Sequence, residues 1–295
     1  MDKKKSLSGL CNQNNTFLKS ILKKAKLDVR IDNHLYNRED IINILSKNNI
    51  KAYKSLKSDI GITIEKRIPE NLFNKIKKNY FEIQDEGSQI MSLMVGAKKG
   101  ENILDYCAGK GTKSLTLYNQ INKHKGLYVY EKNLARLDFL IKRISKVKAS
   151  NIKVIYDFSR FKDFFDKIVV DVPCSGSGVW RRKPENMIYL NKADLKEHII
   201  SQGKILDNVV KYCKNNGLII YITCSILREE NEGQIKRFLL KHKNFKTVNL
   251  KKVLEEKFKF KLKEKNIKWF TLYPNKLISD GYFICIMKKN LFKNL

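Results

Sequence analysis

Short apolar runs alternate with amphipathic segments from residue 102 to the C-terminal end. The runs begin near residues 102, 127, 152, 168 and 217, and polar side chains follow each of them. The segments between them repeat apolar residues three or four positions apart, as at Leu137, Leu140 and Ile144. Continuous apolar runs are typical of strands buried on both faces, and the longer spacing is typical of helices. The pattern therefore predicts an α/β, Rossmann-like fold with a mainly parallel, doubly wound sheet.

The same pattern sets the order of the elements. Predicted strands cover residues 102–105, 127–130, 152–155, 168–171, 217–223 and 282–287. Predicted helices cover a segment from residue 114 onward and residues 134–144, 195–213 and 228–242. Ahead of them, Ile90, Leu93, Met94 and Ala97 share one helical face, with Ser88 as the expected N-cap. Residues 251–268 are basic and weakly patterned, and we expect them on the surface.

The chain is strongly basic. It has 60 lysines and arginines against 30 acidic residues, which gives a formal net charge of +30 and a pI near 9.8. Such a field attracts polyanions, and the phosphate backbone of a nucleic acid is the usual partner. A genome with biased composition would raise the lysine content in the same way, so the charge permits RNA binding without requiring it.

A small α+β unit is predicted over residues 25–82. It combines strands at 27–31, 52–56 and 61–64 with helices at 38–47 and after Pro69. RNA docking and plain packing are both open roles for a unit of this size. The predicted division is a lysine-rich lead-in over residues 1–24, this unit over 25–82, and a catalytic domain over 83–295.

Composition narrows the class of protein further. No apolar segment follows Met1, and the longest apolar runs are strand-sized, so we expect neither a signal sequence nor a membrane partner. The six cysteines are widely spaced, without a Cys-x-x-Cys pair or an adjacent histidine, which predicts no metal site. We therefore expect a monomeric, cytoplasmic protein with reduced thiols.

Acidic side chains end four of the predicted strands: Asp105, Glu131, Asp157 and Asp171. Ligands of open α/β sheets bind beyond the carboxyl ends of the strands, so these carboxylates are expected along one rim. Glu131 has the placement that accepts both hydroxyls of a ribose, and Asp157 could accept from an adenine amino group. Gly109 and Gly111 allow close approach of the loop backbone. The loop is not a P-loop, and NAD and S-adenosylmethionine fit these features equally.

Two cysteines follow two of the predicted strands. Cys174 stands three residues after Asp171 in the segment Asp-Val-Pro-Cys-Ser-Gly-Ser-Gly, and Cys224 follows the strand 217–223. A thiolate that adds to C6 of a cytosine makes C5 nucleophilic, so two thiols and a carboxylate supply the groups that C5 methylation needs. A lone cysteine is more often a small buried apolar residue, but a pair at two strand ends favours chemistry.

The attacking thiol needs a positive environment, because a free thiol has a pKa of roughly 8.5. Arg181, Arg182 and Lys183 are the candidates for that field, and equally for contacts with phosphates.

Five motifs occur in order between Gln84 and Met287. They are Gln84-Asp85-x-x-Ser88-Gln89, Asp105 to Lys113, Asp171 to Gly178 with Arg181-Arg182-x-Pro184-Glu185, Tyr221 to Ser225 with Glu230-Asn231-Glu232, and Asp280-Gly281-Tyr282-Phe283. Together they resemble the RsmB/NOL1/NOP2/Sun group of RNA 5-methylcytosine methyltransferases. The resemblance implies a class I methyltransferase fold with S-adenosyl-L-methionine as cofactor. It also implies an RNA substrate, which the bacterial members suggest is 16S rRNA.

The resemblance implies a role for each matched residue. Cys224 would be the nucleophile at C6, Cys174 would assist release of the methylated base, and Asp171 would hold the cytosine near N3 and its amino group. The cofactor would be held by Cys107, Ala108, Gly109, Lys110, Gly111, Thr112, Lys113, Glu131, Asp157 and Asp171. Cytosine methyltransferases that act on DNA use the Pro-Cys thiol as nucleophile, so the assignment of Cys224 rests on the resemblance.

The cofactor loop departs from the family pattern of a proline and two adjacent glycines, because Lys110 and Thr112 intrude. A lysine at this rim would either pair with the carboxylate of the cofactor or weaken its binding. Two further functions stay open: methylation of tRNA by the same chemistry, and RNA binding in ribosome assembly without catalysis. A dehydrogenase would fit the sheet but would leave both thiols without a role.

Overall fold

The computed structural model of the chain describes residues 20, 23–66, 68–69, 73, 76, 81–274 and 279–291. Most of the lysine-rich lead-in over residues 1–24 lies outside the described residues, as does most of the helix expected after Pro69.

The larger sheet has eight strands in the order β10-β12-β9-β8-β5-β6-β7, with β11 also paired to β12. Its parallel strands are β5 (Ile103–Asp105), β6 (Leu127–Val129), β7 (Lys153–Val154), β8 (Phe165–Asp171) and β9 (Cys213–Thr223). Its antiparallel strands are β10 (Phe245–Thr247), β11 (Phe270–Leu272) and β12 (Tyr282–Lys289). The predicted Rossmann-like, mainly parallel sheet is confirmed.

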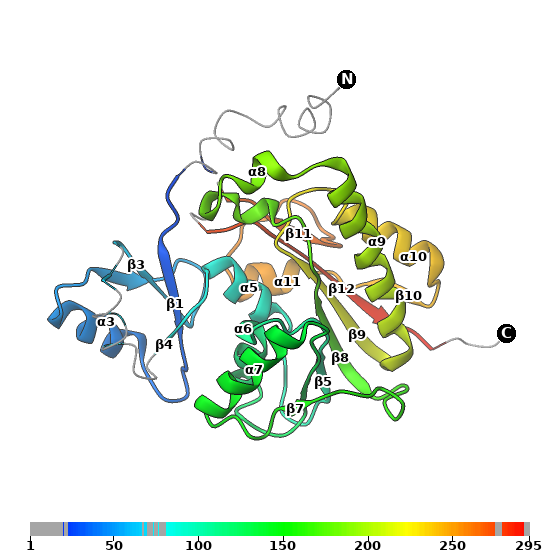
Figure 1. The fold of residues 1–295 in the computed structure, drawn as a ribbon, viewed down its shortest axis with the longest axis horizontal. Helices are drawn as coiled ribbons and strands as arrows, with labels where there is room; N and C mark the ends of the chain where they lie inside the picture. The colour runs from blue at the N-terminus through cyan, green and yellow to red at the C-terminus, as the bar shows by residue number, and fades with distance from the viewer. Residues whose placement is uncertain are drawn as a thin grey trace.

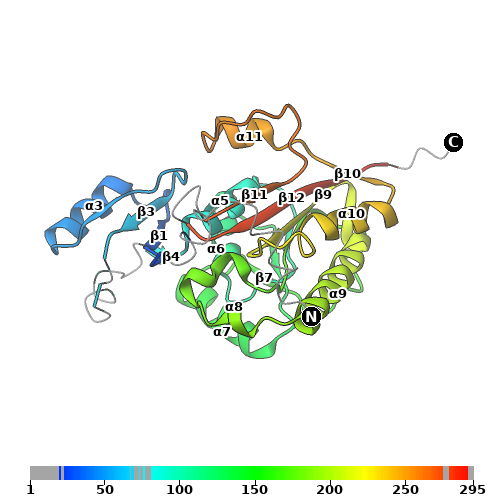
Figure 2. The same ribbon diagram turned by 90° about the horizontal axis from the view of Figure 1, so that it is seen from above.

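Helices cover both faces of this sheet (Figures 1 and 2). One face packs against α5 (Glu86–Met94), α6 (Thr112–Gln120), α7 (Leu134–Lys146) and α11 (Lys251–Glu256). The other packs against α9 (Lys192–Val209) and α10 (Glu232–Lys241), while the short α8 (Asn186–Tyr189) precedes α9. Alternate residues of each strand enter the two cores, as a strand repeat of two requires. None of the helices in the described part of the chain is long and apolar enough to cross a bilayer.

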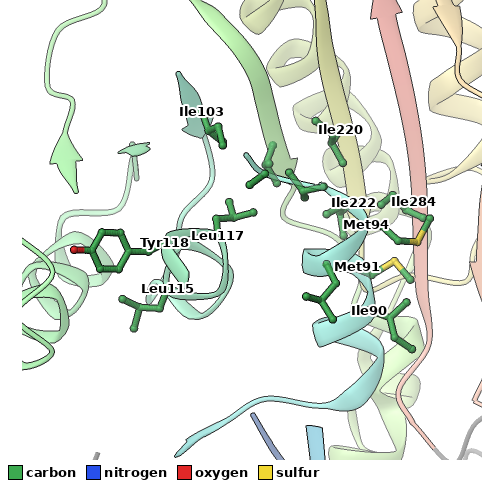
Figure 3. Packing of buried hydrophobic residues seen from close by; sticks show 14 of the residues in the cluster. Ile90, Met91, Met94, Ile103, Leu115, Leu117, Tyr118, Ile220, Ile222 and Ile284 are labelled. Carbon is green, nitrogen blue, oxygen red and sulfur yellow. The ribbon is translucent and has the colours of Figure 1, made fainter. Parts of the chain in front are cut away.

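Figure 3 shows the first of these cores. Met91 and Met94 of α5 pack beside Ile222 of β9 and Ile284 of β12, and all four side chains are buried. The methionines are therefore part of the core and not part of a ligand pocket.

The N-terminal unit is a separate four-stranded antiparallel sheet in the order β2-β3-β1-β4. Its strands are β1 (Leu27–Ile31), β2 (Ala52–Lys54), β3 (Gly61–Ile64) and β4 (Phe81–Ile83), and α3 (Arg38–Lys47) packs on them. The strand β4 was not predicted, since three residues are too few to show a period. Figure 1 shows the unit in blue beside α6 and α7.

Several element boundaries differ from the sequence predictions, among them those of α5, α6 and β9. The helix α5 begins at Glu86, and its N-cap is Asp85, whose carboxylate accepts from the Gly87 N–H, so the prediction of Ser88 was wrong. The helix α6 already begins at Thr112.

The third difference is in β9, which begins at Cys213 and not at residue 217. Asn216 has a φ of +63°, and the pairing of β9 with β8 shifts register between Phe165 and Lys167. The segment Asn215-Asn216-Gly217 therefore forms an irregularity inside a strand, whereas the sequence prediction ended the helix 195–213 just before it.

We predict that Phe283→Ala lowers the free energy of unfolding by about 3–5 kcal/mol, because this fully buried ring on β12 leaves a cavity. The control is Leu240→Ala on α10, where the residue is 69% exposed. This substitution should change the free energy of unfolding by less than about 0.5 kcal/mol. Urea unfolding measures both. Equal midpoints for the two variants would contradict the assignment of Phe283 to the core.

Candidate active site

The two cysteine loops meet at the carboxyl edge of the larger sheet. The strands β8 and β9 are adjacent and parallel, so the loops that follow Asp171 and Thr223 leave the sheet side by side. The Sγ atoms of Cys174 and Cys224 lie 3.2 Å apart, and both side chains are partly exposed. The structure therefore brings together the two thiols that the sequence placed at separate strand ends.

Gly178 joins these loops through its backbone. Its N–H donates to the carbonyl of Cys224 at 2.9 Å, and its carbonyl accepts from the N–H of Gly281 at 2.8 Å. A Cβ at this position would lie 2.2 Å from the Gly281 oxygen and 2.9 Å from the Cys224 oxygen. Only glycine allows this approach, which explains the second glycine of the Ser-Gly-Ser-Gly segment.

A buried carboxylate fixes the loop of Cys174. Glu230 has no exposed surface, and it accepts hydrogen bonds from the Ser175 N–H at 2.8 Å, from the Ser175 hydroxyl, and from the Gln202 amide at 2.9 Å. The neighbouring Asn231 amide donates to the carbonyl of Ser225 at 2.9 Å. The Glu-Asn-Glu motif therefore serves to position the cysteine loops, a role that sequence spacing did not reveal.

Asp171 forms an ion pair with Lys113, with 2.6 Å between the carboxylate Oδ2 and Nζ. The side chains are 28% and 11% exposed, so the pair is largely withdrawn from water. Burial alone would lower the pKa of Lys113, but the charges of Asp171, Cys224 and Asp105 outweigh it and raise that pKa. Lys113, predicted only as part of the cofactor loop, thus presents a stable ammonium close to the thiols.

Cys174 is held in its protonated form. Its hydrogen bond to Cys224, its burial, and the negative charges of Cys224 and Glu230 raise its pKa well above that of a free thiol. When Cys224 is a thiolate, Cys174 therefore keeps its proton and donates a hydrogen bond to the sulfur of Cys224.

The arginines after Cys174 do not provide the positive field that we expected. Arg181 pairs with Asp280 at 2.9 Å, and Arg182 pairs with both Asp280 and Asp85, at 3.0 Å for the latter. Burial and the charge of Asp85 raise the pKa of Asp280 to about 7, against the opposing effect of the arginines. This cluster ties the start of α5 to the segment before β12, and Lys113 is the cation at the thiols.

The cofactor loop shows a shape that fits a ligand. Gly109 and Gly111 have φ angles of +55° and +82°, and a Cβ on Gly109 would face open space. Glu131 accepts from the N–H groups of Gly109 and Asn133, each at 2.8 Å. Cys107 is partly exposed and Ala108 is buried beside it. The carboxylate of Glu131 retains further acceptor sites beyond these two hydrogen bonds.

Asp105 is buried beneath this loop. One carboxylate oxygen accepts from the Ser114 hydroxyl at 2.7 Å, and Oδ1 has no partner among the described residues. Burial raises the pKa of Asp105 to about 7, opposed by the Ser114 hydrogen bond and assisted by the charge of Asp171. Sequence analysis placed Asp105 on the rim without a role, and its unpartnered oxygen is a candidate acceptor for a ligand or an ordered water.

The two unusual loop residues are bound to α7. The ammonium of Lys110 lies 5.1 Å from the ring centre of Phe139. Arg143 donates to the Lys110 carbonyl and to the Thr112 hydroxyl, each at 3.0 Å, and also pairs with Glu82 of β4 at 2.6 Å. Contacts with α7 therefore account for both departures from the family loop.

Asp157 lies apart from these contacts, in an exposed turn after β7. Its carboxylate accepts from the backbone and the hydroxyl of Ser159, and these hydrogen bonds lower its pKa. A role for Asp157 toward adenine stays a prediction.

We predict that mild oxidation with diamide joins Cys174 to Cys224, because their sulfurs already touch. Peptide mapping under non-reducing conditions would show this bridge, while the buried Cys213 and Cys285 stay reduced. Cys174→Ser is the control that removes it. A map in which the sulfurs of 174 and 224 are never joined would contradict the observed geometry.

Known proteins resemble the chain in sequence and in fold. The family model described as 16S rRNA methyltransferase RsmB/F matches residues 92–288. Ribosomal RNA small subunit methyltransferase B of Photorhabdus laumondii is 29% identical over 76% of the chain and 53% of its own length. A probable ribosomal RNA small subunit methyltransferase B of Bacillus subtilis is 31% identical over 70% of the chain and 47% of its own length.

The chain thus spans about half the length of these curated relatives. The structure of NSun6 from Pyrococcus horikoshii with SFG superposes with a TM-score of 0.75 at 18% identity, covering 93% of this chain and 94% of that one. This similarity confirms the class I methyltransferase fold. Since the family model covers most of the chain, including both cysteine loops, the protein belongs to the RsmB/F family of 16S rRNA methyltransferases.

Proposed function

We propose that the protein transfers a methyl group from S-adenosyl-L-methionine to C5 of a cytosine in RNA, with 16S rRNA as the substrate. The observation that carries this proposal is the contact of the Cys174 and Cys224 sulfurs beside the Lys113–Asp171 ion pair. The names of the curated relatives support ribosomal RNA as the substrate class. The excess of 30 positive charges fits a polyanionic substrate.

Cys224 would act as the nucleophile. Its thiolate adds to C6 of the cytosine, and the electron pair of the C5–C6 bond becomes available at C5 for methyl transfer. The ammonium of Lys113 would lie near this thiolate before attack, since the charges of Lys113 and Cys224 interact. Asp171, held by Lys113, would bind the base near N3 and its amino group, and a base in a stem would first be flipped out.

Cys174 would complete the reaction. The C5 proton leaves after methylation, the C6–S bond breaks, and the thiolate of Cys224 is restored. One cause of the raised pKa of Cys174 is the negative charge on Cys224. That charge is absent while Cys224 is bonded to carbon, so formation of the adduct lowers the pKa of Cys174 and favours its thiolate, the form that would accept the C5 proton.

The residues of the cofactor loop fit S-adenosylmethionine, which would supply a methyl group activated on a sulfonium. Residues 107–113 and Glu131 would hold it, with Asp157 near the adenine and Asp171 beside the methyl group. The unpartnered oxygen of Asp105 provides an acceptor for the cationic end of the molecule. SFG, an analogue of S-adenosylmethionine, is present in the NSun6 structure and supports this choice.

The N-terminal sheet would dock the RNA, and the protein would work as a cytoplasmic monomer. Methylation of tRNA is the alternative within the same chemistry. Bisulfite sequencing of total RNA from a strain without the gene separates the two substrates, because the missing 5-methylcytosine would lie either in 16S rRNA or in a tRNA.

We predict that Cys224→Ala lowers methyl transfer to 16S rRNA by at least about a thousandfold while RNA still binds, because the covalent step is lost. Cys174→Ala should instead accumulate protein joined to RNA, since release of the methylated base fails. Transfer of a radiolabelled methyl group and a denaturing gel measure the two effects.

The reverse pattern would assign the nucleophile to Cys174. Full activity in both variants would remove covalent catalysis from the proposal, and an assembly factor without catalysis would show no methyl transfer in the wild type.

We predict that affinity for S-adenosylhomocysteine rises about tenfold from pH 6 to pH 8. Asp105 has a pKa of about 7, so it changes from mainly protonated to mainly ionised over this range, and the ionised form binds a cationic group. Calorimetry on the wild type and on Asp105→Asn measures the effect. Any pH dependence that remains in the variant comes from titration of the ligand and is subtracted. Parallel pH profiles for the two proteins would exclude Asp105 as the group responsible.

A further inference from the structure

A groove of about 1020 Å³ lies between the N-terminal sheet and the helices α6 and α7. Figures 1 and 2 both show β1 and β4 beside these helices. The groove is separate from the thiols and is not used by the methyl transfer described above. It adjoins the cofactor loop where Phe139 lies under the ammonium of Lys110 and Arg143 donates to the Lys110 carbonyl.

One face of α7 forms the basic wall of this groove. Phe139, Lys142, Arg143 and Lys146 lie at i, i+3, i+4 and i+7, so they share a face, and all four line the groove. Arg143 is paired with Glu82, but neither Lys142 nor Lys146 forms an ion pair with any described residue, and both are exposed.

A buried arginine lines the opposite wall. Arg30 of β1 is only 3% exposed, and its Nε has no hydrogen-bond partner among the described residues. The charges of Glu82 and Asp32, which also line the groove, favour the charged guanidinium, but its buried Nε lacks an acceptor, and a phosphate oxygen is an acceptor that matches its geometry. Burial lowers the pKa of Arg30 to about 10, which still leaves it positively charged at neutral pH.

Exposed rings and aliphatic groups lie between the positive charges. Phe139 is 48% exposed, and Leu35 and Val147, which also line the groove, are 60% and 39% exposed. An aromatic ring among cations is the arrangement that binds single-stranded RNA, where bases stack on rings and phosphates meet lysine and arginine. A duplex has no free bases to stack, so the ring would contribute nothing to its binding.

We propose that this groove binds a single-stranded segment of the RNA substrate, away from the target base. Phosphates would contact Arg30, Lys142 and Lys146, and a base would stack on Phe139. The proposal rests on RNA being the substrate, but it does not depend on cytosine methylation. Because Arg143 joins Glu82 of the groove to the carbonyl of Lys110, the bound segment would lie directly behind the cofactor loop.

The test is equilibrium binding of an unstructured oligoribonucleotide of about 20 adenines and uracils, which lacks cytosine and so cannot engage the catalytic thiols. The double variant Lys142→Ala/Lys146→Ala should bind it about tenfold more weakly at moderate salt. The slope of log affinity against log salt should fall by about 1.4, since each lost single-strand phosphate contact removes about 0.7.

The matched control is Lys204→Ala/Lys288→Ala. These lysines are exposed on α9 and β12, neither of which lines the groove, and their loss changes the net charge equally. The control should leave the salt slope unchanged. Equal losses in the two double variants would show only the effect of overall charge and would overturn the proposal.

Phe139→Ala separates single strands from duplexes. It should weaken binding of the oligoribonucleotide at least about fivefold without changing the salt slope, because stacking involves no ions. It should leave binding of an adenine–uracil duplex unchanged. An unaffected oligoribonucleotide, or a duplex bound as tightly as the single strand by the wild type, would overturn the assignment to single-stranded RNA.

Arg30→Lys tests the buried arginine, because it retains the charge and removes the planar fork. It should weaken binding of the oligoribonucleotide while the thermal unfolding midpoint changes little. Unchanged binding in a folded variant would remove Arg30 from the site. None of these measurements needs methyl transfer. The binding proposal can therefore be contradicted while the proposed methyl transfer is confirmed, and methyl transfer can be contradicted while the binding proposal is confirmed.

Discussion

Two backbone hydrogen bonds of Gly178 join the loops that contain the candidate chemistry. One connects the loop after β8 to the carbonyl of Cys224 after β9, and the other connects it to Gly281 before β12. The approach is so close that no side chain fits. Without it, the two parallel strands would still end at the same edge, but the backbones of the two loops would lose the direct link that helps to hold the cysteine sulfurs 3.2 Å apart. The same three loops are also held by the hydrogen bonds of the buried Glu230 and by the ion pairs of Arg181 and Arg182 with Asp280.

Charge is distributed unevenly around this junction. Arg181 and Arg182 form ion pairs with Asp280 and Asp85. Lys113 is the cation whose charge interacts with that of Cys224. Lys113 in turn pairs with Asp171, the residue that we propose binds the base. Glu131, part of the carboxylate rim, positions the glycine loop by accepting from Gly109. The same loop thus contributes to the cofactor side through its backbone and to the thiol side through one side chain.

Sequence alone predicted the sheet, the strand-end carboxylates and the shared edge of Cys174 and Cys224, because apolar runs and parallel connections determine them. It did not predict β4, β10 or β11, because none of these three-residue strands has two adjacent apolar residues, whereas β5 and β6 do. It also left Arg181 and Arg182 as candidates for the field at the thiols or for phosphate contacts, because their partner Asp280 is almost a hundred residues away and no local spacing reveals such a pair. The predicted start of β9 was wrong, because the irregularity at Asn216 inside this strand resembles the end of a helix in sequence.

The central claim is that the thiolate of Cys224 attacks the base while the thiol of Cys174 stays protonated. RNA substituted with 5-fluorocytidine tests this most directly, because fluorine at C5 cannot leave as a proton does and the adduct therefore persists. After incubation with S-adenosylmethionine, digestion and mass spectrometry identify the modified peptide. The account predicts a nucleotide attached to the peptide that contains Cys224. Attachment at Cys174, or recovery of both cysteines unmodified, would contradict it.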